Sequence, residues 1–300
     1  MMQGEDVCIL IPTLDESRTI GEVVDGFHEQ GFTDVLVIDG GSTDDTRAVA
    51  EKHGARVVQQ SGSGKGQAVQ EALGMVESEY VILVDGDGTY DPADAPKLLE
   101  PLREGQAEHV IGNRFADMRD GSMTRFNRLG NRLINRAFRY IHGRDFKDIL
   151  SGYRAFSLES TERFHLQATG FGIETELAVE CAKYDVTTTV VPITYRPRPE
   201  DSDTNLHPLR DGAVIFATLY RLAKTNNPLF YFGSLGVLSL LFGGGLATYV
   251  GIEWFRYSVS HEVLAVVAGV AILFGVQLIM FGVLSDMILA LHREQLRRLE

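Results

Sequence analysis

The chain has 300 residues, of which 44% are hydrophobic and 23% charged, the composition of a globular protein. Its formal net charge of −13 argues against a nucleic-acid partner, because a phosphate backbone attracts basic surfaces. An acidic surface of this kind is also compatible with a high-salt cytoplasm. The N-terminal sequence has no basic segment followed by a long apolar run, so we expect no signal peptide and a cytosolic location for the first ~225 residues.

The first half of the chain alternates between strand and helix patterns. Strands are predicted at residues 7–12, 34–39, 55–60, 80–85 and 109–112, and helices at residues 17–30, 44–53, 65–76 and 92–103. This alternation predicts βαβ units, hence a Rossmann-like α/β domain whose mainly parallel sheet has helices on both faces. Ligands of such sheets bind outside the carboxyl ends of the strands, where this sequence has "PTLDES", "DGGSTDD" and "DGDGTYD".

The aspartates in "VILVDGDGTYDP" are the most specific chemical signal. Asp85 and Asp87 are two residues apart, so both carboxylates reach one ion, and Gly86 lets the backbone approach a ligand closely. Clustered carboxylates raise each other's pKa unless a cation joins them, and Mg²⁺ or Mn²⁺ is typically held by one or two carboxylates with substrate phosphates. We therefore expect a metal–diphosphate site. An Asx-rich turn is the alternative, and Asp91 is expected to be the N-cap of the next helix.

After Gly112 the pattern changes to a long helix at 126–141, a further helix ending near Tyr184 and a strand at 187–196. The long helix has arginines at three- and four-residue steps, which makes one face cationic: Arg125, Arg128, Arg132, Arg136 and Arg139. This face is suited to a lipid phosphate or anionic headgroups. A solvated basic surface is the alternative.

Two C-terminal stretches, residues 229–252 and 263–285, contain no charged residue. Because about 20 apolar residues cross a bilayer as a helix, they predict a transmembrane hairpin, with a pair of buried core helices as the alternative. Basic residues flank both ends of the pair, whereas the connection carries only Arg256, so both ends are expected in the cytosol. Glycines in the spans (residues 243–245, 269 and 275) allow close helix packing and a homo-oligomer, or bending.

The predicted organisation has four parts: a cytosolic domain at 1–206, an amphipathic interfacial helix at 207–227, the two transmembrane helices within 228–291, and a cytosolic tail at 292–300. An ordinary surface helix is the alternative for 207–227, because its apolar spacing fits either location.

Five motifs in order carry a resemblance to a known family. They are "PTLDE" (12–16), "VIDGGSTDDT" (37–46), "VDGDGTYDP" (84–92), "GNRF" (112–115) and "SGYRAF" (151–156). The set resembles the family 2 glycosyltransferases of GT-A fold, and is most similar to the polyprenyl-phosphate branch, the dolichyl-phosphate hexose synthases. Archaeal members that start S-layer N-glycosylation are the most similar. The resemblance covers about residues 5–210, and the hairpin is similar to the membrane anchors of that branch.

The resemblance implies roles for the motif residues. The nucleotide sugar would contact Pro12, Leu14, Glu16, Ile38, Asp39, Lys65, Asp85, Gly86 and Asp87. Asp85, Asp87 and Thr89 would hold the metal, Mg²⁺ or Mn²⁺. Arg114, Arg125, Arg128 and Arg198 would bind the acceptor phosphate, and Asp85, Asp87, Arg114 and Arg198 would form the catalytic set. Where the family usually has a second aspartate after Asp39, this chain has Gly40; Thr89 stands where some relatives have glutamine.

The activity implied is the inverting transfer of a hexose, glucose from UDP-glucose by resemblance, to dolichyl phosphate at the cytoplasmic face of the plasma membrane. GDP-mannose and UDP-N-acetylglucosamine stay open as donors, and another lipid stays open as acceptor. A nucleotide-sugar-binding membrane scaffold is the non-enzymatic alternative; loss of the aspartate pair or the arginines would favour it, and both are present. Glu174 and Glu176 in "GFGIETE" are candidates for contacts to sugar hydroxyls, or else acids of a first helical turn.

Overall fold

A computed structural model describes residues 6–168, 170, 172–198, 217, 220 and 227–297, with the side chains of 292–297 outside the description. The chain divides into two compact units, Met1–Leu219 and Tyr220–Glu300, which are treated separately below. The predicted interfacial helix at 207–227 lies almost wholly outside the described residues.

The first unit is built on a seven-stranded sheet with the order β3-β2-β1-β4-β6-β5-β7. Its strands are β1 (Val7–Thr13), β2 (Asp34–Asp39), β3 (Arg56–Gln59), β4 (Tyr80–Leu83), β5 (His109–Met118), β6 (Arg154–Ser157) and β7 (Thr188–Tyr195). Only β6 is antiparallel to its neighbours, β4 and β5. The predicted mainly parallel α/β sheet is confirmed, with the short strand β6 added inside the "SGYRAF" motif.

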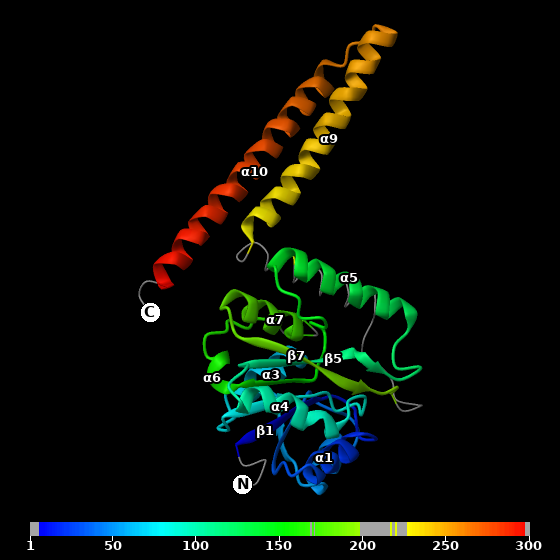
Figure 1. Cartoon of the computed structure of the whole chain (residues 1–300). Helices are drawn as coiled ribbons and strands as arrows, with labels where there is room; N and C mark the ends of the chain where they lie inside the picture. Colours follow the sequence, from blue (N-terminus) through cyan, green and yellow to red (C-terminus); the bar gives the residue numbers. More distant parts are fainter. Residues whose placement is uncertain are drawn as a thin grey trace. The chain divides into compact units, whose positions relative to one another are not determined.

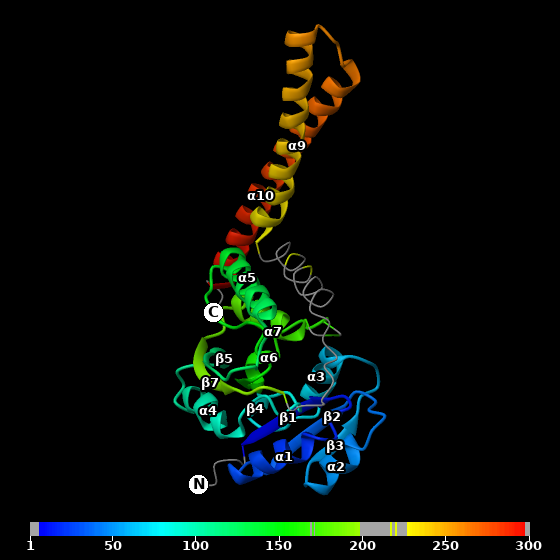
Figure 2. The ribbon, with the colours of Figure 1, turned by 90° about the vertical axis from the view of Figure 1, so that its right-hand side faces the viewer.

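Helices cover the sheet on both faces (Figures 1 and 2). They are α1 (Ile20–Glu29), α2 (Thr46–Lys52), α3 (Lys65–Leu73), α4 (Ala95–Arg103), α5 (Arg125–His142), α6 (Leu158–Thr161) and α7 (Ile173–Lys183). The helix predicted at 92–103 begins with a separate 3₁₀ turn, η1 (Pro92–Asp94). Asp91 is its N-cap as predicted, because its side chain accepts a hydrogen bond from the backbone N–H of Ala93 at 3.1 Å.

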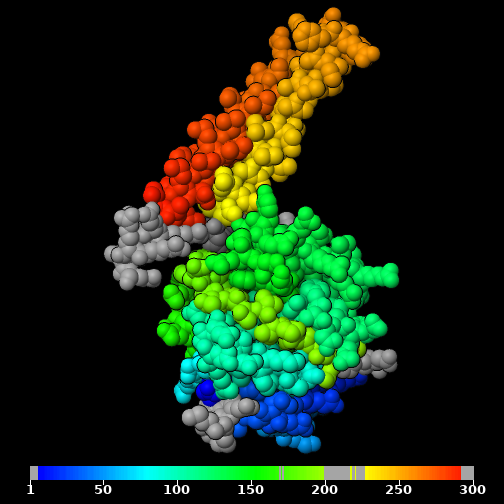
Figure 3. All heavy atoms as spheres, in the orientation of Figure 1, coloured from blue at the N-terminus to red at the C-terminus, as the bar shows by residue number. Residues whose placement is uncertain are grey.

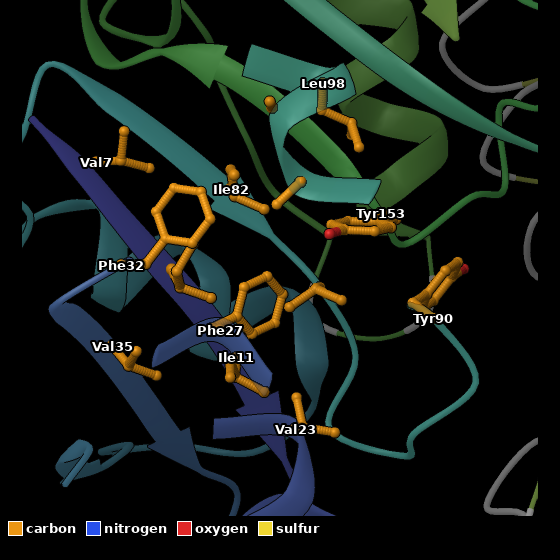
Figure 4. Packing of buried hydrophobic residues seen from close by; sticks show 14 of the residues in the cluster. Val7, Ile11, Val23, Phe27, Phe32, Val35, Ile82, Tyr90, Leu98 and Tyr153 are labelled. Carbon is orange, nitrogen blue, oxygen red and sulfur yellow. The ribbon is translucent and has the colours of Figure 1, made fainter. Parts of the chain in front are cut away.

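The principal core lies between one face of the sheet and helices α1 and α4. Val7, Ile9 and Ile11 of β1 pack there with Phe27 of α1 and Leu98 of α4, and all are fully buried (Figure 4). The alternate residues of β1, such as Leu10, point to the opposite face and are also fully buried. Burial on both faces explains why the strands have continuous apolar runs, and it leaves only the strand ends for polar chemistry.

The second unit contains helices α9 (Pro228–Tyr257) and α10 (Glu262–Arg297). Both are long and apolar enough to cross a membrane, and they expose large apolar side chains along their length. They pack side by side at glycines: a Cβ on Gly275 would meet the carbonyl oxygen of Gly236 at 2.8 Å, and one on Gly243 would meet that of Ala268 at 2.9 Å. The hairpin is therefore present, and it uses Gly243 and Gly275 within itself; the homo-oligomer stays a prediction.

Candidate active site

A cavity of about 530 Å³ opens at the carboxyl ends of β1 and β4 and extends to α5. Its lining joins residues from distant parts of the sequence. Most of the predicted site residues are among them: Pro12, Leu14, Glu16, Lys65, Asp85, Gly86, Asp87, Thr89, Arg114 and Arg198. This is the edge where a parallel sheet brings its polar strand ends together.

Asp85 forms an ion pair with Lys65, the first residue of α3. The ammonium of Lys65 contacts both Asp85 Oδ1 and Glu174 Oε1, and the exposed fractions of the three side chains are 13%, 28% and 6% respectively. Burial alone would lower the pKa of Lys65, but the two carboxylates raise it overall, so the side chain is charged. The other oxygen of Asp85 lies against Gly152, where a Cβ would approach it to 2.5 Å.

Asp87 is held by the turn that follows it. Its Oδ1 accepts hydrogen bonds from the hydroxyl of Thr89 at 2.6 Å and from the Thr89 N–H at 3.1 Å. Its Oδ2 lies 3.6 Å from the guanidinium of Arg198. Burial, and then the charge of Asp85, raises the pKa of Asp87. Thr89 thus orients Asp87, and Asp85 lies close enough to disfavour the ionisation of Asp87.

Glu16 completes the charged end of the cavity. It pairs with Arg198 and has a side chain only 11% exposed. Burial raises its pKa to about 7, although Arg198 opposes the shift. The "PTLDE" segment is fixed by the first residue of α2, because the Glu16 N–H donates to the Thr46 hydroxyl at 2.8 Å. A carboxylate that titrates near neutrality therefore faces the same space as Asp85 and Asp87.

The described residues offer no ready-made group of three or more His, Cys, Asp or Glu ligands for a metal ion. Asp85 and Asp87 nevertheless each direct a carboxylate to the cavity, and their Oδ2 atoms make no hydrogen bond with a described residue. Two carboxylate oxygens fit a Mg²⁺ or Mn²⁺ ion that takes its remaining ligands from a diphosphate and water. The donor set thus fits a metal that enters with a nucleotide.

The opposite end of the cavity is organised by a buried ion pair that sequence reasoning missed. Arg114 donates from Nε and Nη2 to Asp148, both at 2.8 Å, and Asp148 is fully buried. A third bond, at 3.0 Å, joins Arg114 Nη2 to the side-chain oxygen of Asn131 on α5. Arg114 therefore lies in the cavity wall, but its guanidinium is already bound by Asp148 and Asn131; its role toward the acceptor phosphate stays a prediction. The signal for Asp148 was its place just before "SGYRAF".

Two predicted nucleotide contacts lie outside the cavity lining. Asp39 is fully buried; its Oδ2 accepts from the N–H groups of Gly41 and Ser42, both at 3.0 Å, and its Oδ1 accepts from the Ser42 hydroxyl. Ile38 is a core residue of β2. Asp39 therefore shapes the turn after β2, and Gly40 is the residue of this segment that lines the cavity.

Helix α5 presents two different faces. Toward the cavity it places Asn127, Asn131 and Ile134. Outward it exposes Phe126, Leu129 and Leu133 by 56–59%, interleaved with arginines that include Arg125 and Arg132. Figure 3 shows green side chains of this region projecting from the surface of the first unit. Arg125 and Arg128 are thus on α5 as predicted, although neither lines the cavity.

The two acids of "GFGIETE" have different places. Glu174 lines the cavity beside Lys65. Glu176 instead accepts hydrogen bonds from the N–H groups of Gln167 and Ala168, at 2.8 and 2.7 Å, and so fixes the segment before α7. In the first turn of α7, Glu174 therefore faces the cavity, whereas Glu176 has a structural role.

Comparison with known proteins gives consistent results. The family model described as Glycosyl transferase family 2 matches residues 8–163. Glycosyltransferase AglJ of Haloferax volcanii is 64% identical, over 100% of this chain and 99% of its own. The Dolichyl-phosphate hexose transferase of the same organism is 30% identical, over 73% of this chain and 94% of its own. Glucosyl-3-phosphoglycerate synthase of Mycobacterium tuberculosis, solved with Mn²⁺ and UDP-glucose, is 26% identical with a TM-score of 0.57, over 72% of this chain and 78% of its own.

Proposed function

Because this chain belongs to glycosyltransferase family 2, we propose that it transfers a hexose from a nucleotide sugar, with UDP-glucose as the preferred donor, to dolichyl phosphate with inversion at the anomeric carbon. The product would serve protein N-glycosylation. The observation that carries this proposal is that one cavity joins the Asp85–Asp87 pair at one end to α5 at the other. A relative named as a dolichyl-phosphate hexose transferase and a structural neighbour solved with Mn²⁺ and UDP-glucose support the acceptor and the donor.

The donor would bind at the strand ends with its diphosphate facing Asp85 and Asp87. A bound Mg²⁺ or Mn²⁺ would supply charge neutralisation of the leaving diphosphate. The chain's own part is to hold the carboxylates in place: Thr89 fixes Asp87, and Gly152 leaves room for Asp85. Lys65 and Arg198 add positive charge beside the diphosphate, where preorganised donors favour the separation of charge in the transition state.

The acceptor needs no strong general base, because a phosphate monoester is already anionic. It must instead be held against its repulsion from the diphosphate, and arginine does this by bidentate contact. Arg198 lies in the cavity wall, and Arg114 fixes Asn131 on the cavity side of α5. A direct line from acceptor phosphate to the anomeric carbon, opposite the diphosphate, gives inversion in one displacement.

A lipid acceptor is supported by the outward face of α5 and by the hairpin. Phe126 both lines the cavity and exposes 58% of its surface, so the cavity mouth is bordered by an apolar side chain. Leu129 and Leu133 continue that stripe beside arginines, a pattern suited to the boundary of an anionic membrane. With α9 and α10 as spans and basic residues at both ends of the pair, we place the catalytic domain at the cytoplasmic face of the plasma membrane.

The test is a transfer assay on membranes that contain the full chain. Radiolabelled UDP-glucose, GDP-mannose and UDP-N-acetylglucosamine are offered separately with dolichyl phosphate, with and without a chelator. We expect label from UDP-glucose in the lipid phase, lost with chelator and restored by Mn²⁺ or Mg²⁺. Label from another donor corrects the sugar. No lipid-phase label from any donor, with folded protein, overturns the proposal.

The lipid side of the proposal has its own test. Leu129→Glu with Leu133→Glu should leave UDP binding unchanged while lowering transfer to membrane-borne dolichyl phosphate by about a hundredfold or more, because each buried leucine contributes ~1.5–3 kcal/mol to membrane contact. A short-chain, water-soluble polyprenyl phosphate should be used equally well by both proteins. Equal use of the membrane-borne acceptor would contradict the assigned membrane face.

A further inference from the structure

Lys65 is a largely enclosed cation of the cavity, and it contacts a predicted metal ligand. Its ammonium pairs with Asp85 and with Glu174, and only 13% of its side chain is exposed. Lys65 pairs with Oδ1 of Asp85, the same carboxylate that offers its Oδ2 to a divalent ion. A metal bound to that carboxylate and an ammonium bonded to it would repel each other at short range.

Lys65 also lies beside the space that a diphosphate would occupy. Gly64, with a φ of +92°, ends the loop before α3, and both Gly64 and Lys65 line the cavity. The N–H groups at the start of this nine-residue helix lie in the same region, which adds to the attraction for an anion. A lysine is a flexible point charge, so it changes partner with a small movement of its stem.

We propose that Lys65 couples metal binding to nucleotide binding. In the nucleotide-free protein its ammonium neutralises Asp85 and Glu174, which weakens the binding of a divalent ion in the absence of a nucleotide. When the metal enters together with a nucleoside diphosphate, Lys65 releases Asp85 to the metal, keeps Glu174 and turns to the diphosphate oxygens. No bond is made or broken, since one ionic contact replaces another. The inference rests on the proposed metal-dependent function and adds the order in which the ligands bind.

Glu174 is necessary to this exchange. It is 5% exposed and pairs with Lys65 from the first turn of α7. Without Glu174 the Lys65 ammonium would pair with Asp85 alone, and an incoming metal ion would displace it from Asp85 less easily. The structure therefore assigns Glu174 as the positioning residue for Lys65.

The test measures Mn²⁺ affinity from the free-ion signal in electron paramagnetic resonance, with and without UDP, on the purified full chain. In the native protein we expect UDP to strengthen Mn²⁺ binding strongly. In Lys65→Met, Mn²⁺ alone should bind more tightly than in the native protein, and the strengthening by UDP should shrink by about tenfold or more, because coupling between two ligands is reciprocal. Lys97→Met, which breaks an aspartate–lysine pair outside the cavity, is the matched control and should leave both affinities unchanged.

Unchanged UDP coupling in Lys65→Met overturns the inference while leaving the proposed function intact. If native protein with UDP binds no Mn²⁺, the metal-dependent part of the proposed function fails instead. Should Lys65→Met not fold, Glu174→Gln decides: it should weaken binding of Mn²⁺ alone and increase the strengthening by UDP. A Glu174→Gln protein with native coupling would then overturn the inference.

Discussion

The two ends of the cavity hold their charges in opposite ways. At the end formed by β1, β4 and α3, the cations Lys65 and Arg198 face four carboxylates, those of Glu16, Asp85, Asp87 and Glu174. At the end formed by β5 and α5, Arg114 is bound by the fully buried Asp148 through both arms of its guanidinium.

The difference indicates which end is suited to an exchangeable charged ligand. The first end has an excess of negative charge and partners that can be exchanged, which suits a metal–diphosphate complex. The second end is already neutral, because a buried arginine without its carboxylate would carry a large desolvation cost. We therefore expect substitutions at the first end to reduce catalysis and substitutions at the second end to reduce stability.

The largest effect is expected for Asp87→Ala. It removes a predicted metal ligand, so transfer should fall by about 10³-fold or more while the thermal unfolding temperature stays close to that of the native protein. Steady-state transfer and circular dichroism on the same preparation check both parts. Asp45→Ala, at an exposed position outside the cavity, is the matched control. Full activity in Asp87→Ala would remove the basis for the metal site.

Asp148→Asn should remove the ion pair that stabilises the second end of the cavity. It leaves Arg114 buried and unpaired, so the free energy of unfolding should fall by about 3–5 kcal/mol. Denaturant unfolding followed by circular dichroism is the measurement, because the single tryptophan, Trp254, lies in the hairpin and does not report on this domain. The exposed pairs of Asp145 provide the control, since Asp145→Asn should cost under ~1 kcal/mol. Equal costs for the two variants would contradict the contrast between the ends.

Gly152 belongs to the segment between the two ends of the cavity, because it lies beside Asp85 and four residues after Asp148. Its substitution by alanine tests how precisely Asp85 must be placed. The new Cβ would sit 2.5 Å from Asp85 Oδ2 and displace that carboxylate. A misplacement of about 1 Å costs roughly 10²-fold in kcat/KM, and we expect a loss of that order. Gly74→Ala, whose Cβ has an ordinary 3.4 Å contact, should keep native activity. An unimpaired Gly152→Ala enzyme would show that the position of Asp85 is not critical.

The smallest expected effect is a pH-dependent change in stability caused by Glu16→Gln. Burial raises the pKa of Glu16 from 4.5 to about 7, so the folded protein holds this proton more tightly than the unfolded chain does. Stability from this group is therefore present at low pH and is lost as pH rises toward 7. Glu16→Gln should raise the free energy of unfolding by about 1–2 kcal/mol at pH 8, with the gain vanishing near pH 4.5, after allowance for partial solvent screening. A gain of the same size at both pH values would exclude titration of Glu16 as its cause.

Much of the fold could be predicted because apolar runs and their polar ends are local signals. The bounds of β2, Asp34–Asp39, were predicted as observed, and the predicted bounds of β1 differ from the observed ones by one residue. The antiparallel strand β6 was not predicted, because it is only four residues long and begins with an arginine. In the folded protein this buried Arg154 donates hydrogen bonds to the carbonyls of Ile149 and Ser151. Local hydrophobicity does not reveal a buried arginine of this kind.

The site was predicted unevenly for the same reason. Asp85, Asp87, Glu16 and Thr89 follow strands directly, so the topology alone brings them to one edge. Asp39 is the last residue of β2, but its carboxylate accepts hydrogen bonds from Ser42 and from the N–H of Gly41 and so does not face the cavity. The roles of the metal pair, of Lys65 and of the arginines stay predictions until the variants are measured.

The sequence by itself determined the alternating α/β pattern, the apolar hairpin and the residues that end each strand, because each depends on neighbours within a few positions. Only the tertiary structure decided which charges meet. Lys65 reaches Glu174, and Arg114 reaches Asp148, across separations that no local pattern encodes. A carboxylate takes whichever cation the packed chain brings within about 4 Å, and that choice is made by the packing of helices on the sheet rather than by the residues beside it.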